Sequence, residues 1–217
     1  MVAAAKGGAA DDGPSPADAE PGVLRIGVLA LQGDVAEHLD ALARCGAHGV
    51  PFRRAADLEG LDGIILPGGE STTIGMLATA FGLVGPLQAR IEAGMPAWGT
   101  CAGLILLARD IGRDQPLIGG LDVAVDRNAF GRQIDSFEAD VPVLGLAGGP
   151  FPAVFIRAPS VRAAGDAVAV RARLADGTIV AVRQGQLFGT AFHPELTGDD
   201  RLHAEFVAAC REARERV

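Results

Sequence analysis

Three short apolar runs, each leading into a glycine-containing turn, most constrain what this chain can fold into. They are VLRIGVLAL before QGD, GIIL before PGG and MPAW before GTC, and they start at Val23, Gly63 and Met95. Nearly continuous apolar runs of this length are typical of strands that are buried on both faces. Segments with helical periodicity follow the runs, and such an alternation predicts a parallel sheet between two layers of helices.

The remaining elements complete this pattern. The first helix is predicted to start at Asp34, whose side chain suits an N-cap, and to stop at Gly46. Further helices are expected over residues 71–83, 84–94, 102–110 and 199–217, and strands near 49–52 and over 121–126, 136–143, 152–158, 168–184 and 186–196. A hairpin turn is predicted at Asp176-Gly177. The fold class is therefore a three-layer α/β/α sandwich with a central mixed, mostly parallel sheet.

Composition limits the classes of function. Residues 1–22 contain almost nothing to bury and are predicted to be a disordered tail, which leaves residues 23–217 as one domain. The net charge of −8 argues against nucleic acid or an anionic membrane as a partner. No segment reaches the roughly 18 apolar residues of a membrane span, and the first residues lack a signal peptide's apolar region. With three cysteines, an odd number, we expect free thiols and a cytoplasmic protein.

Cys101 is the strongest candidate for a reactive side chain. It lies in GTCAG, residues 99–103, between a predicted strand and a predicted helix. The glycines permit a sharp turn that exposes the cysteine, and the N-terminus of the following helix favours a thiolate. The alternative is a small apolar side chain in the core, since free cysteine is often buried. Cys45 and Cys210 have no such setting and are expected to be structural.

A cysteine nucleophile needs a base, and His193 in FHPE is the best candidate. It is predicted to end a strand, where active-site residues of α/β sheets gather. In an extended chain Glu195 projects to the same side as His193, so its carboxylate would orient the imidazole. The alternative is a turn with a solvated glutamate. The other histidines, His38, His48 and His203, are expected to be surface or hydrogen-bonded structural residues, His48 in a connecting loop.

The glycine turn in LPGGESTTIG, residues 66–75, follows another predicted strand. Backbone N–H groups of Gly69 and Ala102 are the candidates for an oxyanion hole. The alternative is a tight turn with a helix cap, while a phosphate-binding loop lacks its Gly-Lys-Ser/Thr signature. The chain has no CxxC pair or HExxH motif, so we predict no metal site.

With these residues identified, the chain resembles the triad-type, or class I, glutamine amidotransferases. More narrowly, it is similar to the glutaminase subunits of the two-component pyridoxal 5′-phosphate synthase. The resemblance runs from about Leu24 to the C-terminus, and its motifs are IGVLALQGDVAEH, LPGGESTT, GTCAGLILLA, DRNAFGRQIDSFEAD, FIRAP and FHPELTGDD. The first and fourth of these motifs distinguish the narrower family.

The resemblance implies a role for each matching position. Cys101 would attack the side-chain amide of glutamine, His193 would act as base and acid, and Glu195 would orient His193. Arg127 would bind the α-carboxylate of glutamine, a role that suits guanidinium. The residues implied to line the rest of the glutamine pocket are Gly69, Glu70, Ser71, Ile156 and Arg157. Gln32 would lie at the interface with the synthase subunit.

The same resemblance implies the reaction and the partners. Glutamine would be hydrolysed through a γ-glutamyl thioester, and the ammonia would pass to the synthase subunit within a large hetero-oligomer. No cofactor or metal would serve this chain's own chemistry, and partner docking would order the glycine turn. Two alternatives stay open: a glutaminase subunit for another acceptor, as in histidine biosynthesis, and a non-catalytic relative that kept the fold. A covalent adduct at Cys101 rather than Cys45 or Cys210 would exclude the second.

Overall fold

A computed structural model describes residues 22–127 and 136–216 of the 217-residue chain. The tail predicted over residues 1–22 lies outside the described residues, apart from Gly22. Part of the DRNAFGRQIDSFEAD motif also lies outside them.

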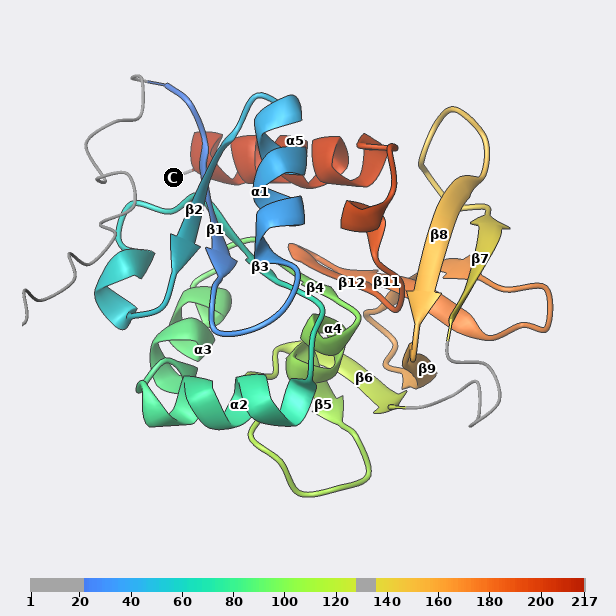
Figure 1. Cartoon of the computed structure of the whole chain (residues 1–217), viewed down its shortest axis with the longest axis horizontal. Helices are drawn as coiled ribbons and strands as arrows, with labels where there is room; N and C mark the ends of the chain where they lie inside the picture. The colour runs from blue at the N-terminus through green and yellow to red at the C-terminus, as the bar shows by residue number, and fades with distance from the viewer. Residues whose placement is uncertain (1–21, 128–135, 217) are drawn as a thin grey trace, which may run out of the picture.

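One large mixed sheet forms the middle of the molecule, and a separate pair of strands stands beside it (Figure 1). The strands are β1 (Arg25–Leu29), β2 (His48–Phe52), β3 (Gly63–Leu66), β4 (Ala97–Thr100), β5 (Ala108–Asp110), β6 (Leu121–Asp126), β7 (Ser136–Val141), β8 (Phe151–Ile156), β9 (Ser160–Ala164), β10 (Ala169–Arg173), β11 (Ile179–Gln184) and β12 (Leu187–Thr190). The order in the large sheet is β2-β1-β3-β4-β12-β11-β9-β6-β5, with β10 paired to β11. β7 and β8 form the separate antiparallel pair.

The two halves of the large sheet differ in strand direction. From β2 to β12 every neighbouring pair is parallel, which matches the apolar runs that begin the chain. β11 then pairs antiparallel with β9, β10 and β12, and β9 pairs antiparallel with β6. The β10–β11 hairpin contains the predicted turn, where Gly177 has a φ of +90° and the backbone N–H of Thr178 donates to Asp176.

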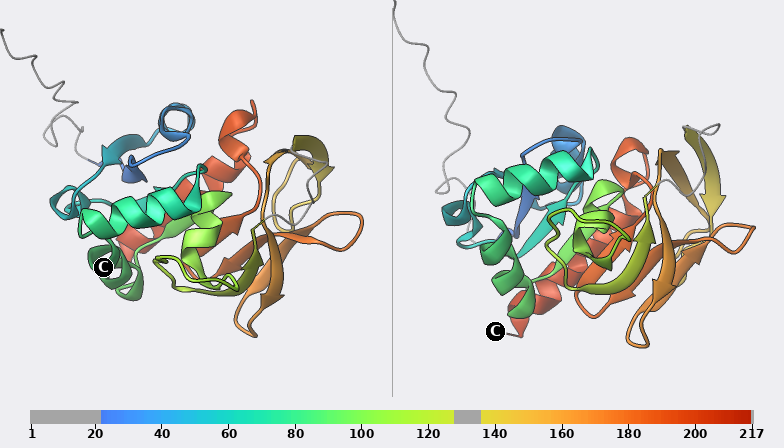
Figure 2. Two further views of the ribbon diagram at one scale, coloured as in Figure 1. Left: turned by 60° about the horizontal axis from the view of Figure 1, so that its bottom comes forward. Right: turned by 90° about the horizontal axis from the view of Figure 1, so that it is seen from below.

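Helices cover both faces of the sheet. They are α1 (Val35–Arg44), α2 (Ser71–Ala80), α3 (Val84–Glu92), α4 (Ala102–Leu107) and α5 (Arg201–Glu215), with short 3₁₀ turns at Ala55–Leu58 and Pro194–Leu196. α1 and α5 lie together on one face, and α2, α3 and α4 lie on the other (Figure 1, Figure 2). The predicted three-layer α/β/α sandwich is confirmed. Among the described residues no single helix is long and apolar enough to cross a membrane, although α2 and α3 joined, with a 97° bend between them, meet the same limits.

Several predicted boundaries were wrong. The helix predicted over 102–110 ends at Leu107, because Ala108 and Asp110 pair with β6 as strand β5. The strand predicted over 186–196 ends at Thr190, and a 3₁₀ turn follows His193. His48 begins β2 instead of lying in a loop. In each case pairing or packing with a distant segment overrides the local pattern.

The parallel half of the sheet determines where functional side chains can gather. β1, β3, β4 and β12 run in the same direction, so their carboxyl ends meet at one edge. The segments that leave this edge are residues 30–34, 67–70, 101 and 191–193. Each of these segments contains a residue predicted for the site or the partner interface, and the other predicted site residues lie in the segments that follow or at the ends of β6 and β8.

Candidate active site

Cys101 lies on a strained turn between β4 and α4. Its φ is +47°, a left-handed conformation that a residue with a side chain rarely adopts. Both glycines of GTCAG are needed for this turn, because the chain packs so closely there that neither position has room for a side chain. A Cβ atom on Gly103 would lie 1.8 Å from the carbonyl oxygen of Leu66 in β3, and one on Gly99 would lie 2.4 Å from the Gly103 carbonyl. The predicted sharp turn at Cys101 is confirmed, but the prediction that the turn exposes the cysteine was wrong, because β8 and β12 pack against the residue and bury it.

The Cys101 side chain is held at the wall of a cavity. The residue is 6% exposed, and its thiol donates to the carbonyl oxygen of Ile156 in β8 over 3.8 Å. Its backbone N–H donates to the carbonyl oxygen of Thr190 at the end of β12. The sulfur is therefore fixed between the two strands that flank the site.

His193 follows β12 and faces two carboxylates. Its backbone N–H donates to Val154 in β8 over 2.8 Å, which fixes the position of the residue. Its Nδ1 lies 2.7 Å from Glu195 Oε1 and 3.2 Å from Asp34 Oδ2. The predicted His193–Glu195 pair is thus present, although a 3₁₀ turn and not an extended chain brings the two side chains together.

Asp34 is a site residue whose role the sequence analysis missed. It was predicted to cap α1, yet its side chain makes no cap hydrogen bond and turns to His193 instead. A signal was available, because the QGD turn follows a parallel strand and therefore lies at the edge where His193 was expected. The N-cap interpretation concealed that signal.

The protonated form of His193 is stabilised by its neighbours. Burial alone would lower its pKa, but hydrogen bonds with Asp34, Cys101 and Glu195 outweigh burial and raise the pKa to about 12. The hydrogen bond with His193 in turn lowers the pKa of Asp34. Burial raises the pKa of Glu195, against the opposing effect of His193. The site therefore favours an imidazolium held between two carboxylates, the partner that a thiolate requires.

The glycine turn after β3 is interlocked with the QGD turn after β1. Gly33 has a φ of +109°, and a Cβ atom there would lie 1.7 Å from the carbonyl oxygen of Gly68. Gly69 has a φ of +146°, and the next residue, Glu70, donates its backbone N–H to Gln32 Oε1 over 2.7 Å. Any displacement of Gln32 therefore acts directly on the Gly69–Glu70 backbone.

Glu70 and Arg127 form a charged pair at the mouth of the cavity. The Glu70 carboxylate accepts the backbone N–H groups of Thr72 and Thr73 and so caps α2. Burial would raise the pKa of Glu70, but these hydrogen bonds lower it to about 2. Arg127 donates to Glu70 Oε1 over 2.8 Å and to Thr72 Oγ1 and Gln115 Oε1, each over 3.1 Å. Thr72 and Gln115 were not predicted, and Gln115 lies in a loop with no distinguishing sequence signal.

A cavity of about 460 Å³ connects these groups. It is lined by Gln32, Gly33, Asp34, Gly69, Glu70, Ser71, Cys101, Ala102, Ile105, Arg127, Ile156, Arg157 and His193. Every predicted catalytic and substrate-binding residue is in this set except Glu195, which lies behind His193. Arg157 has a φ of +43° just after β8 and is one of the residues that line the cavity. The Ser71 hydroxyl is buried and has no hydrogen-bond partner within the described part of the chain.

The cysteines and histidines outside the cavity have structural settings. All three cysteines are free thiols, and burial raises the pKa of Cys210 and of the half-buried Cys45. His38 and His203 are fully buried, and His48 is half-buried in β2. Asp34, His193 and Glu195 are the one group of metal-ligand type within the described residues, with their ligand atoms within 4.8 Å of one another. Their distances of 2.7 and 3.2 Å are those of hydrogen bonds.

Fold and site together define an α/β protein equipped for acyl transfer to a cysteine. The chain belongs to the SNO glutamine amidotransferase family, which matches residues 28–212. It is 62% identical over 192 residues to the pyridoxal 5′-phosphate synthase subunit PdxT of Frankia casuarinae, covering 87% of this chain and 96% of that one. It is 55% identical over 206 residues to the subunit of the same name from Nocardia farcinica, covering 92% and 91%. A crystal structure of a glutamine amidotransferase superimposes with a TM-score of 0.82 at 50% identity, covering 86% of this chain and 98% of that one.

Proposed function

We propose that this chain is the glutaminase subunit of a pyridoxal 5′-phosphate synthase. It hydrolyses L-glutamine to L-glutamate and ammonia, and it supplies the ammonia to a synthase partner in vitamin B6 biosynthesis. Family membership and the name of the 55–62% identical relatives support the reaction and the partner. The observation that carries the chemistry is the strained Cys101 elbow beside the buried His193–Glu195 pair, in one cavity with Arg127.

The proposed catalytic steps use the groups that line the cavity. The Cys101 thiolate attacks the side-chain amide carbon, and backbone N–H groups of Gly69 and Ala102 stabilise the oxyanion that forms. His193 donates its proton to the leaving nitrogen, so ammonia departs and a γ-glutamyl thioester remains. His193 then takes a proton from water, whose oxygen attacks the thioester and releases glutamate. Glu195 keeps Nδ1 of His193 protonated and stabilises the positive charge.

The amino-acid end of glutamine meets the charged side of the cavity. Arg127 binds the α-carboxylate, because its guanidinium is already oriented by Thr72 and Gln115. Glu70 and Ser71 line the same region, and Ile156 and Arg157 complete the cavity wall. These contacts place the side-chain amide toward Cys101.

The synthase partner is expected to control the site through Gln32. Gln32 accepts the backbone N–H of Glu70, so contact of the partner with the QGD turn acts on the Gly69 turn that supplies an oxyanion donor. We therefore expect little glutaminase activity from the isolated chain and a large increase when the synthase is added. High activity of the isolated chain, unchanged by the synthase, would contradict this mechanism.

The decisive variant is Cys101→Ala, assayed in complex with the synthase. Formation of pyridoxal 5′-phosphate from glutamine should be lost, while formation from added ammonia should persist. Cys45→Ala is the matched control, because Cys45 is a half-buried free thiol outside the cavity, and it should keep both activities. Loss of both activities in Cys101→Ala would assign Cys101 a structural role.

The remaining features of the proposal concern organisation. One hydrophobic core runs from Leu24 to Cys210, which supports a single glutaminase domain over residues 23–217. The three free thiols support a cytoplasmic location, and the net charge of −8 supports a protein partner over nucleic acid. The proposal also includes assembly with the synthase into a large hetero-oligomer. It assigns no cofactor and no metal to this chain.

A further inference from the structure

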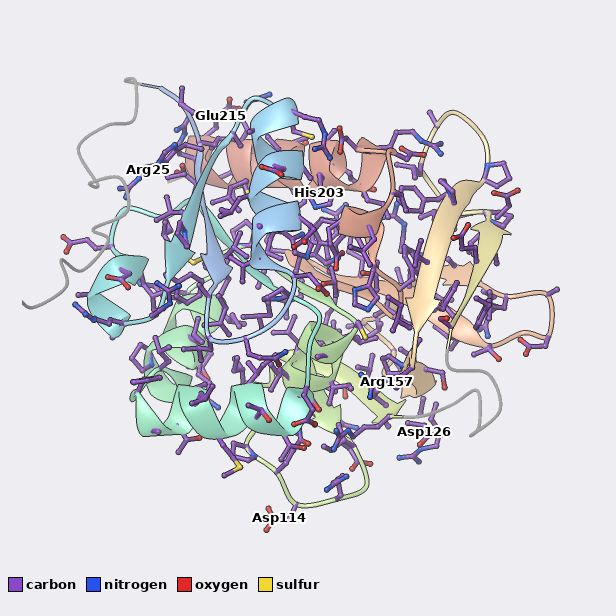
Figure 3. All side chains as sticks on the ribbon, in the orientation of Figure 1. Arg25, Asp114, Asp126, Arg157, His203 and Glu215 are labelled. Carbon is purple, nitrogen blue, oxygen red and sulfur yellow. The ribbon has the colours of Figure 1, made fainter. Side chains whose placement is uncertain are left out.

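A buried polar cluster lies behind the His193–Glu195 pair, on the side away from the cavity. It consists of His38 from α1, Thr100 from β4 and His203 from α5, and none of the three side chains reaches solvent. His203 lies on α5 where this helix packs beside α1 (Figure 3). Buried imidazoles are costly unless they are hydrogen-bonded, so the contacts of this cluster need an explanation.

The cluster is continuous with Glu195. Oε1 of Glu195 is occupied by His193, whereas Oε2 is buried and lies 3.4 Å from His38 Nε2. The same His38 nitrogen lies 3.2 Å from Thr100 Oγ1. The other ring nitrogen of His38, Nδ1, lies 2.9 Å from His203 Nε2. Within the described residues no group, His38 included, meets hydrogen-bond criteria with Oε2, so His38 Nε2 at 3.4 Å is the approach that this otherwise unsatisfied oxygen has.

The position of the protons follows from these contacts. If His38 carried its proton on Nδ1, a nitrogen lone pair would face the Glu195 carboxylate, and His203 Nδ1–H would be a buried donor without an acceptor. If His38 carries its proton on Nε2, that N–H donates to Thr100 Oγ1 and also lies 3.4 Å from Glu195 Oε2, and His203 Nε2–H donates to His38 Nδ1. His203 Nδ1 is then an unprotonated nitrogen, consistent with its having no partner within the described part of the chain. The second arrangement satisfies more groups, since unpaired buried N–H groups are rare.

Both imidazoles are held neutral. Burial is the main cause that lowers the pKa of His38 well below its ordinary value, and the charges of His203 and His193 add to it. Burial lowers the pKa of His203 to about 4, where the effects of Asp200 and Arg44 oppose one another. A neutral imidazole offers one N–H donor to a carboxylate without neutralising its charge, so Glu195 keeps its attraction for His193.

We propose that His38 is a positioning residue for the glutaminase reaction, which directs its Nε2–H to Glu195 and is itself oriented by His203. The catalytic Cys101–His193–Glu195 set thus extends by two histidines into the layer between the sheet and helices α1 and α5. The inference rests on the proposed function, because its consequence is measured on glutamine hydrolysis. Its physical content is the positive end of one N–H beside a buried carboxylate oxygen: without it, Oε2 loses the polar group nearest to it on this side and the carboxylate is free to turn from His193.

Two substitutions of similar size test that proton. In His38→Gln the side-chain amide reaches the position of Nε2 and keeps a donor toward Glu195. In His38→Asn the shorter side chain reaches only the position of Nδ1, so it keeps an acceptor for His203 and loses the contact with Glu195. Both variants replace a buried ring by a smaller amide, so a purely structural effect is expected to be similar in the two. His48→Asn, in β2 and outside the cluster, is the control for histidine replacement.

The measurement is the pH dependence of glutaminase kcat/KM in the assembled complex, normalised to the Cys101 sites that a glutamine-like electrophile labels. The titratable and charged groups around the reaction centre are His193, Glu195, Asp34 and Cys101, then Glu70, Arg127 and Arg157 from the cavity wall, and His38 with His203 from the layer behind. We expect His38→Asn to lose about 10-fold in kcat/KM. Its alkaline limb should move to lower pH, because His193 gives up its proton more readily when Glu195 is less firmly held. His38→Gln should recover most of the rate and restore the limb.

Each outcome decides the proposal. Equal effects of Asn and Gln, or a normal pH profile per labelled site in both, would overturn it. If both variants fail to assemble, the ring tautomer of His38 in the wild-type chain is measured by ¹⁵N NMR, and a proton on Nδ1 would overturn it. A wild-type complex without glutaminase activity would instead reject the proposed function, so the two failures are distinguishable.

Discussion

The Asp34 side chain does not cap the helix that follows it and contacts His193 instead. Its backbone precedes α1, where a carboxylate would normally accept N–H groups of the first turn. Its carboxylate instead lies 3.2 Å from His193 Nδ1 and 2.7 Å from where a Cβ on Gly68 would be. The Asp34 carboxylate thus lies between the QGD turn, His193 and the Gly68–Gly69 turn.

Asp34→Asn removes one of the two negative charges on His193. Because the hydrogen bond with Asp34 raises the pKa of His193, we expect the alkaline limb of glutaminase kcat/KM to move to lower pH. The rate at the optimum should fall about 3- to 10-fold, since Glu195 still orients the ring. A pH–rate profile of the complex measures both effects. An unchanged alkaline limb would show that Glu195 alone sets the protonation of His193.

Arg127→Lys tests recognition of the amino-acid end of glutamine. Lysine keeps the charge but cannot hold Glu70 with one nitrogen and Thr72 with another, as the guanidinium does. We expect KM for glutamine to rise about 10- to 100-fold with a smaller change in kcat, the result for lost binding that is equal in ground and transition states. Arg162→Lys is the control, because Arg162 forms ion pairs with Asp110 and Asp126 outside the cavity. A fall in kcat alone would place Arg127 nearer the reacting amide.

At the scale of elements, the elbow depends on close contact between α4 and β3. Gly103→Ala places a Cβ 1.8 Å from the carbonyl oxygen of Leu66, and neither backbone segment can yield without disturbing the sheet. We expect a loss of more than about 3 kcal/mol in the free energy of unfolding. Denaturant titration measures it.

Gly198→Ala is the matched control for that loss. A Cβ on Gly198 has no atom within 4 Å, and its φ is not left-handed. The free energy of unfolding should stay within about 1 kcal/mol of wild type, with a small gain expected because alanine restricts the unfolded chain. Similar stabilities for Gly103→Ala and Gly198→Ala would mean that the elbow has more room than the contact indicates.

The same elements show what the sequence can reveal. The elbow and the α/β/α layers were predictable because glycine spacing and apolar runs are local signals. The His193–Glu195 pair was predicted from an extended chain, whereas a 3₁₀ turn forms it. The end of α4 at Leu107 was not predictable, because pairing of Ala108 with Leu121 decides it. The partners of Asp34 and the position of Gln115 were equally hidden, because tertiary contacts alone bring them to the site.

At the scale of the whole molecule, the active site and the stability of the fold share buried histidines. His203 and His38 join α5, α1 and the sheet, and both must stay neutral to remain buried. As the pH falls, the cost of keeping these two histidines neutral therefore lowers the free energy of unfolding before most carboxylates become protonated.

The acid stability of the protein should report this layer directly. Burial lowers the pKa of His203 from 6.5 to about 4, so between these pH values the unfolded chain binds more protons than the folded one. The free energy of unfolding must then fall as pH falls through this range, by about 3 kcal/mol for His203 if it acts alone. His203→Asn removes one of the two titrating imidazoles and should reduce the slope between pH 6.5 and 4, measured by denaturant titrations at each pH. Burial raises the pKa of Glu195, which opposes the slope, and lowers the pKa of His38, which adds to it; both groups are present in the two proteins, so the difference isolates His203. Equal slopes for the two proteins would show that His203 is protonated in the folded state.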